Sequence, residues 1–112
     1  MKKHHVTLNP SVYQKLEKIF SYIAAESPQT AIEVLDEIEQ KIMSLESLPK
    51  RFALAPENIT YKNHQVRHFF CKKSFRVIYA INKNEVRILD VRHAAQNPLS
   101  ANDVFSNSKL RS

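Results

Sequence analysis

The sequence has 112 residues, a net charge of +6, no glycine and one cysteine, Cys71. This length allows one domain, the lone cysteine excludes a framework of internal disulfides, and the lack of glycine excludes glycine-rich nucleotide-binding loops. Because no apolar run approaches a membrane span and the basic start has no apolar signal segment, we expect one cytoplasmic domain over residues 1–112 without a membrane partner. The basic surplus favours a polyanionic partner, either nucleic acid or an acidic protein segment.

A short strand and a capped helix are predicted at the start of the chain. Residues 3–8 have the composition of a strand, and Asn9-Pro10 is typical of a helix N-cap with proline at the first helical position. The apolar residues that follow share one helical face: Val12, Leu16, Ile19, Phe20 and Ile23.

A second amphipathic helix is predicted directly afterwards. Ser27-Pro28 repeats the start signal, and Pro49 ends the pattern near Leu48. The apolar residues between them again recur at helical spacing: Ala31, Leu35, Ile38, Ile42 and Leu45. Because the connection is short, we expect the two helices to form an antiparallel hairpin.

Residues 49–64 lack a steady period and indicate an irregular connector, with a short turn near residues 52–54. Three strands are predicted to follow, over residues 66–73, 74–82 and 85–93. Asn97-Pro98 or Ser100 is a cap signal for a short C-terminal helix, and residues 106–112 read as a frayed tail. The predicted fold class is α+β: an N-terminal strand, an antiparallel helical hairpin and a three-stranded antiparallel meander in one small sheet.

Two tight turns, at Lys83-Asn84 and Lys73-Ser74, would set which side chains share a face of the meander. One face is then apolar and should pack on the helices: Val66, Phe70, Phe75, Val77, Tyr79, Ile81, Val86 and Ile88. The opposite face collects the other parity: Arg67, Phe69, Cys71, Arg76, Ile78, Ala80, Arg87, Leu89, Val91 and His93. A slip of one residue would move a strand's residues to the other face.

The candidate site is a basic cluster on that opposite face. Arg76 and Arg67 would hold phosphate oxygens, and His93 would transfer protons near neutral pH. The candidate substrate-binding residues are Arg87, Phe69 and Arg92. A solvated basic face without function explains the same pattern. The histidines and Cys71 have no ligand-like spacing, so we expect no metal and no other cofactor.

The chain resembles the RelE/ParE superfamily of toxins from bacterial type II toxin–antitoxin systems. Two stretches carry the resemblance: LNPSVYQKLEKIFSYIA, with its capped helix after a strand, and VRHFFCKKSFRVIYAINKNEVRILDVRHAA, with an R-x-x-Y strand, a tight turn and an apolar strand ending at Arg-His. The resemblance covers nearly the whole chain. It implies a small basic toxin that a cognate acidic antitoxin neutralises.

The superfamily contains two mechanisms, and the resemblance implies one of them. RelE-like members cut mRNA in the ribosome, and ParE-like members inhibit DNA gyrase without being nucleases. Arg76 stands at the position of a RelE catalytic arginine, Arg67 near a catalytic lysine, and His93 at the histidine that ends the last strand. Phe69 and Cys71 stand where RelE has further basic residues. A basic RNA-binding module without toxicity is the alternative from another class.

Overall fold

The computed structural model describes residues 3–60, 64–72 and 74–94. The elements follow the order β1 (His5–Leu8), α1 (Pro10–Ala24), α2 (Pro28–Ser44), β2 (Ala53–Leu54), the 3₁₀ helix η1 (Pro56–Thr60), β3 (Gln65–Cys71), β4 (Phe75–Asn82) and β5 (Glu85–His93). The predicted order of strand, helical hairpin and three strands is confirmed. The predicted C-terminal helix and the tail at 106–112 lie outside the described residues. No helix in the described part of the chain has the length and apolar composition needed to cross a membrane.

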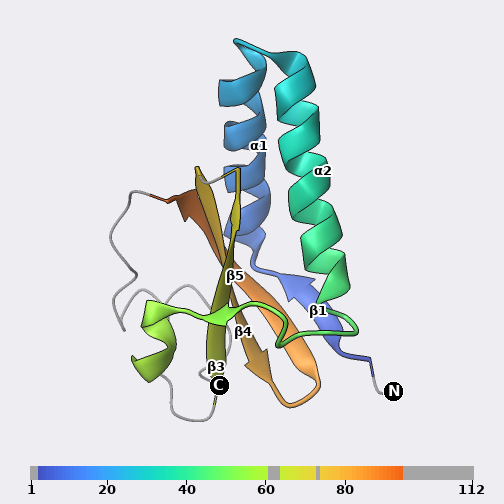
Figure 1. Cartoon of the computed structure of the whole chain (residues 1–112), viewed down its shortest axis with the longest axis vertical. Helices are drawn as coiled ribbons and strands as arrows, with labels where there is room; N and C mark the ends of the chain where they lie inside the picture. Colours follow the sequence, from blue (N-terminus) through green and yellow to red (C-terminus); the bar gives the residue numbers. More distant parts are fainter. Residues whose placement is uncertain (1–2, 61–63, 73, 95–112) are drawn as a thin grey trace.

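The strands form one five-stranded mixed sheet in the order β1-β5-β4-β3-β2. The N-terminal strand β1 pairs in parallel with β5, and the other neighbours are antiparallel. Strand β2 extends the predicted meander at its other edge, because two residues of the connector pair with β3. The helices α1 and α2 cover one face of the sheet, and η1 lies on the other side (Figure 1).

Both helices begin where they were predicted, at Asn9-Pro10 and at Ser27-Pro28, but the two N-caps differ. Ser27 Oγ accepts a hydrogen bond from the Thr30 backbone N–H at 3.2 Å, as an N-cap serine should. Asn9 is 1 % exposed and makes no such cap. Its side chain instead donates to the Leu89 carbonyl and accepts from Arg87 Nη1, both at 3.4 Å. Asn9 therefore fixes the start of α1 to β5.

The main core lies between the helical hairpin and the sheet. Its buried members come from both helices and from β3, β4 and β5: Val12, Val34, Ile38, Ile42, Leu45, Phe69, Cys71, Val77, Tyr79, Ile81, Val86, Ile88 and Val91. On α2, Val34 is buried, whereas Leu35 is only half-buried. The predicted apolar stripe of this helix is therefore rotated slightly, which leaves part of it open to solvent.

The register between β4 and β5 is as predicted near the turn and differs beyond it. Ile81 pairs with Val86 and Tyr79 with Ile88, as a two-residue turn requires. A bulge between Ile78 and Tyr79 then shifts the pairing, so that Val77 lies opposite Val91. A bulge adds one unpaired residue and reverses the facing of everything beyond it on the bulged strand. His93 is therefore on the helix-facing side, and its predicted facing is wrong.

The register between β3 and β4 is shifted by one residue from the prediction. Cys71 pairs with Phe75, whereas the predicted two-residue turn at Lys73-Ser74 would have paired Cys71 with Arg76. Lys72 takes a left-handed backbone angle in this turn, with φ of 55°. The shift reverses every side chain of β3. Phe69 and Cys71 consequently lie in the core, and Phe70 is 46 % exposed.

Candidate functional site

The three predicted catalytic residues do not share a face. Arg76 lies on the outer face, opposite Arg92 of β5. Arg67 pairs with Tyr79 and has that residue's helix-facing parity, and His93 pairs with Phe75 at the far end of β5. The prediction that Arg76, Arg67 and His93 form one anion-facing cluster on the same face is therefore wrong. The cause is the pair of register changes, since either one moves its strand's residues to the opposite side.

Arg76 is a buried residue that forms an ion pair with a glutamate of η1. Its side chain is 6 % exposed and that of Glu57 is 0 % exposed. Arg76 Nη2 donates to Glu57 Oε2 at 2.7 Å, and Nη1 donates to Oε1 at 3.2 Å. This is the two-pronged geometry in which a guanidinium and a carboxylate match best. The pair attaches η1 to the outer face of the sheet.

His68 completes this network from the neighbouring strand. Its Nδ1 lies 2.9 Å from Arg76 Nη1. A guanidinium has only donors, so His68 Nδ1 must be the unprotonated acceptor. Burial, reinforced by the charge of Arg76, lowers the pKa of His68 below its ordinary value, although Glu57 opposes the shift. The network therefore holds a neutral imidazole against a charged pair.

Arg67 supports the backbone of the connector. Its Nη1 donates to the Phe52 carbonyl at 2.5 Å and its Nε donates to Gln65 Oε1 at 3.0 Å. Tyr79, which lies beside it, donates its hydroxyl to the Pro49 carbonyl at 2.7 Å. Burial raises the pKa of Tyr79 to about 12, so this hydroxyl stays protonated as a donor. Together the two side chains fix the start of the connector.

The candidate substrate-binding residues also separate. Phe69 is 3 % exposed and its ring packs on Phe52 at 4.8 Å between centroids, so it lies inside the core and not on an outer floor. Arg87 remains on the outer face but bonds to Asn9 and to Glu85 at 3.4 Å. Arg92 forms an ion pair with Asp90, with 3.9 Å between Nε and Oδ2.

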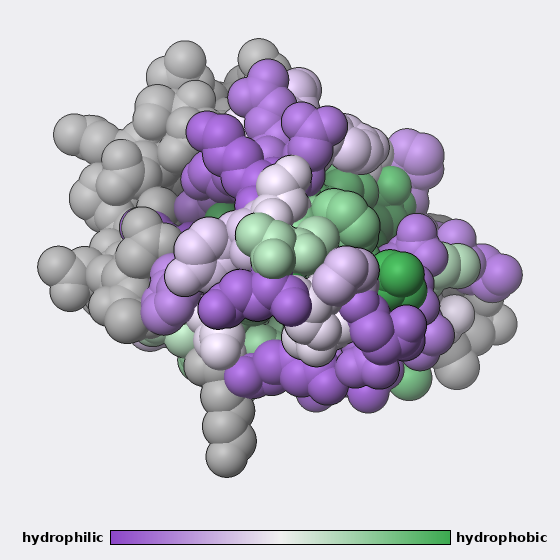
Figure 2. Space-filling view, turned by 90° about the horizontal axis from the view of Figure 1, so that it is seen from above, coloured by the Kyte–Doolittle hydropathy of each residue, from purple (hydrophilic) through white to green (hydrophobic). Residues whose placement is uncertain are grey.

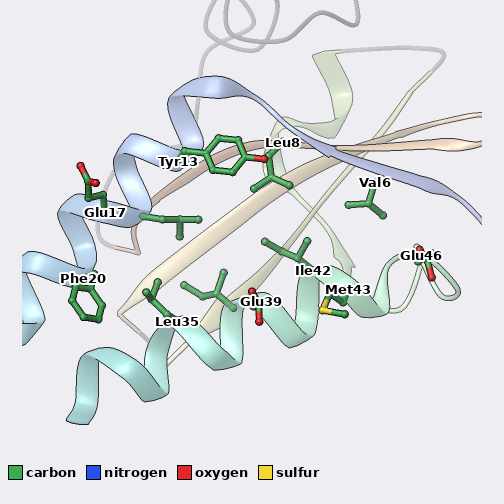
Figure 3. Close-up of a pocket in the computed structure, with 12 residues that line it drawn as sticks. Val6, Leu8, Tyr13, Glu17, Phe20, Leu35, Glu39, Ile42, Met43 and Glu46 are labelled. Atoms are coloured by element: carbon green, nitrogen blue, oxygen red, sulfur yellow. The ribbon is translucent and has the colours of Figure 1, made fainter. Parts of the chain in front are cut away.

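A surface feature that the sequence analysis missed is an apolar groove of about 750 Å³ between β1 and the two helices. Its lining residues are Val6, Leu8, Tyr13, Leu16, Glu17, Phe20, Leu35, Ile38, Glu39, Ile42, Met43 and Glu46. We call this the apolar groove. Figure 3 shows Leu35 and Ile42 of α2 facing toward Leu8 of β1 and the side chains of α1 across it. Tyr13 and Met43 are 61 % and 66 % exposed.

The sequence contained one signal for this groove. Tyr13 and Met43 are apolar residues outside the two predicted core stripes, so they widen the apolar surface of both helices. An apolar surface of this kind, with polar residues at its rim, marks a binding site in a monomeric protein. The rim here carries three carboxylates, those of Glu17, Glu39 and Glu46.

Comparison with known proteins defines the class to which this chain belongs. Residues 6–98 match the family described as the ParE toxin of the type II toxin–antitoxin system parDE. The match spans most of the chain, so the chain belongs to the ParE toxin family, within the RelE/ParE superfamily. The superfamily resemblance and the toxin function predicted from sequence are both confirmed. None of the curated protein sequences matches this one significantly.

Two solved structures have the same fold. A chain of the chromosomal ParDE toxin–antitoxin system from P. aeruginosa matches with a TM-score of 0.64 and 16 % identity, covering 83 % of this chain and 98 % of that one. A chain of the archaeal RelE–RelB complex from Pyrococcus horikoshii OT3 matches with a TM-score of 0.52 and 16 % identity, covering 87 % of this chain and 100 % of that one. At this identity the likeness concerns the fold.

Proposed function

We propose that this type II toxin inhibits DNA gyrase by binding it, and that it does not cut RNA. The observation that carries the proposal is the state of Arg76, the residue at the RelE catalytic position. Its guanidinium is directed at Glu57 and His68 and is nearly inaccessible to a phosphate. Membership of the ParE family supports the same mechanism.

The chemistry of RNA cleavage gives the physical reason. Attack of a ribose 2′-OH on the adjacent phosphate requires a base, an acid and a charge-stabilising donor within hydrogen-bond reach of one reacting group. Arg76 and His93 lie on different sides of the sheet, and Arg67 is bonded to backbone carbonyls. No single phosphate position satisfies the three predicted residues together. A binding mechanism requires no such convergence.

The test compares two activities of the purified toxin. We expect it to block supercoiling by gyrase, and we expect primer extension on translated mRNA to detect no cleavage. His93→Gln and Arg67→Lys should leave ribosomal mRNA equally intact. The appearance of cleavage that depends on His93 would establish the nuclease mechanism instead. Neither activity, with normal growth on expression, would favour the non-toxic RNA-binding alternative.

We propose that the apolar groove is the docking site of the cognate antitoxin. An amphipathic helix presents its anchors at helical spacing and fits a groove of this shape. Glu17, Glu39 and Glu46 at the rim favour Lys or Arg residues flanking those anchors. An antitoxin that is acidic overall can still carry such a segment. The two similar solved structures come from toxin–antitoxin systems, which supports an antitoxin partner.

The groove test uses two exposed residues of α2. Met43 lines the apolar groove and is 66 % exposed, whereas Ile32 is 47 % exposed and does not line it. Met43→Glu buries an unpaired charge on docking, so we expect antitoxin affinity measured by calorimetry to fall by roughly tenfold or more. Ile32→Glu is the control and should bind normally. Equal affinities for both variants would place the antitoxin elsewhere.

A further inference from the structure

A second groove, of about 800 Å³, lies between the two helices, the β3–β4 turn and the adjoining ends of β4 and β5. The residues that matter here are Lys18 and Tyr22 of α1, Lys72 of the β3–β4 turn, Phe75 of β4, and Arg92 and His93 of β5. We call this the basic groove. It is separate from the apolar groove, because the two are lined by different sides of α1. Figure 2 views the molecule from the end of the helical hairpin, where hydrophilic residues surround a smaller apolar patch.

The cations of the basic groove are only partly neutralised. Lys15 forms an ion pair with Asp90, and Arg92 lies 3.9 Å from the same carboxylate. One buried carboxylate therefore balances the charge of two basic side chains. Within the described residues, Lys18 and Lys72 form no ion pair. Among the described residues that line the groove, Glu33 is the one acid. The groove therefore has a net positive charge available for a ligand.

Aromatic rings line the groove together with these cations. Tyr22 is 78 % exposed, which is unusual for a large ring with no role in the core. The rings of Phe75 and His93 meet edge to face, with their centroids 6.0 Å apart, on the same groove. Basic side chains that follow a backbone, together with exposed rings on which bases stack, are the features of surfaces that bind single strands of nucleic acid.

We propose that the basic groove binds a single strand of nucleic acid, with Lys18 and Lys72 on its phosphates and Tyr22 stacked on a base. A run of acidic side chains would use the lysines but would leave the exposed ring of Tyr22 without an aromatic ring to stack on. The strand and an antitoxin helix can occupy the protein together, since their grooves are on different sides of α1. This binding goes beyond gyrase inhibition and does not require it.

Fluorescence anisotropy of the purified full chain with a labelled oligonucleotide tests the proposal, at a length of roughly 12 nucleotides. DNA and RNA strands of the same sequence identify the source of the ligand, and binding of either supports the site. Loss of one stacked base should weaken affinity by about tenfold in Tyr22→Ala. Tyr13→Ala is the matched control, because Tyr13 is also exposed on α1 but lines the apolar groove, and it should bind normally.

Salt dependence tests the lysines. For a single strand, each phosphate contact contributes about 0.7 to the magnitude of the slope of log K against log salt concentration. The double variant Lys18→Ala/Lys72→Ala removes two contacts and should therefore lower that magnitude by about 1.4. Absence of binding at low salt would overturn the proposal. A second result would also overturn it: the Tyr22→Ala and Tyr13→Ala variants bind the oligonucleotide equally well, and polyglutamate displaces the oligonucleotide completely. That result would show that the groove binds acidic peptides. Gyrase is not in the assay, so failure here leaves the gyrase proposal standing.

Discussion

The two faces of the sheet are stabilised in different ways. The helix-facing side is an aliphatic core in which the hairpin packs on β3, β4 and β5. The outer face has a small apolar cluster, Ala55, Val66, Ile78, Ala80 and Leu89, and beside it the buried pair of Arg76 and Glu57. On the first face, the contribution of a residue to the free energy of unfolding scales with the apolar surface that it buries. On the second face, a guanidinium at a position that suggests catalysis instead holds the connector on the sheet.

The difference predicts different responses to mutation. Truncation of an aliphatic residue leaves a cavity whose cost is graded. Removal of one partner from a buried ion pair leaves an uncompensated charge, whereas replacement of both partners by apolar residues is often neutral. Arg76 and Glu57 should therefore behave as one unit.

The largest effect is expected for Arg76→Ala, because it leaves the Glu57 carboxylate buried without its guanidinium. The free energy of unfolding should fall by about 3–5 kcal/mol. Arg87→Ala on the same face is the control, since Arg87 makes only long hydrogen bonds of 3.4 Å, and it should cost about 1 kcal/mol or less. Urea unfolding measures both. Similar small losses would mean that the Arg76–Glu57 pair contributes little.

The next effect concerns the aliphatic face. Ile38 is 1 % exposed, so Ile38→Ala should lower the free energy of unfolding by about 2–5 kcal/mol. Ile32 of the same helix is 47 % exposed, and Ile32→Ala should change it by about 0.5 kcal/mol or less. Thermal unfolding of the two variants is the measurement. A cost at Ile38 no greater than at Ile32 would exclude that face of α2 from the core.

A smaller effect is expected from pH, and it belongs to the outer face. The pKa of His68 is lower in the folded protein than in the unfolded chain, mainly because of burial and also because of Arg76. The unfolded state therefore binds more protons below about pH 6.5, and the free energy of unfolding should decrease as the pH falls from there. Urea titrations between about pH 7 and 5 measure this.

The matched variant for the pH effect is His68→Gln. It should flatten the pH dependence, leaving the part that comes from His64, whose pKa burial also lowers. A dependence of unchanged slope in His68→Gln would mean that His68 does not carry it.

The smallest effect concerns the turn that determines which residues reach which face. Lys83 has φ of 56°, a left-handed angle that glycine adopts without a steric cost. Lys83→Gly should therefore raise the free energy of unfolding by about 0.5–1 kcal/mol. Asn84→Gly should lower it, because Asn84 has no such angle. The reverse order in chemical denaturation would place the strain elsewhere in the turn.

The helical hairpin was predictable because caps and periodicity are local. Asn9-Pro10 and Ser27-Pro28 mark where α1 and α2 begin, and the spacing of apolar residues marks their buried sides. The two-residue turn at Lys83-Asn84 was predictable for the same reason. What sets the rest of the register is not local. A bulge at Ile78/Tyr79 and a left-handed lysine at position 72 leave no signature in a chain without glycine.

The candidate site was predicted less well, because its geometry depends on that register. The partner of Arg76 lies 19 residues away in a connector without a period. One signal was present: Glu57 is the only acidic residue between positions 47 and 84, within the basic half of the chain. A lone acid in such a stretch is a natural partner for one of its arginines. The apolar groove could not be predicted for the same reason. It forms because β1 pairs with β5, which places β1 next to the helical hairpin.

Toxicity of the double variant Glu57→Leu/Arg76→Met tests the central claim most directly. The claim is that Arg76 acts in structure and that the toxin works by binding. The double variant replaces both charges with apolar side chains, so it should unfold at nearly the wild-type urea concentration. Growth after induction is then measured beside the wild-type protein. We predict that the double variant still arrests growth. A variant that folds normally yet leaves growth unaffected would contradict the account and return Arg76 to a catalytic role.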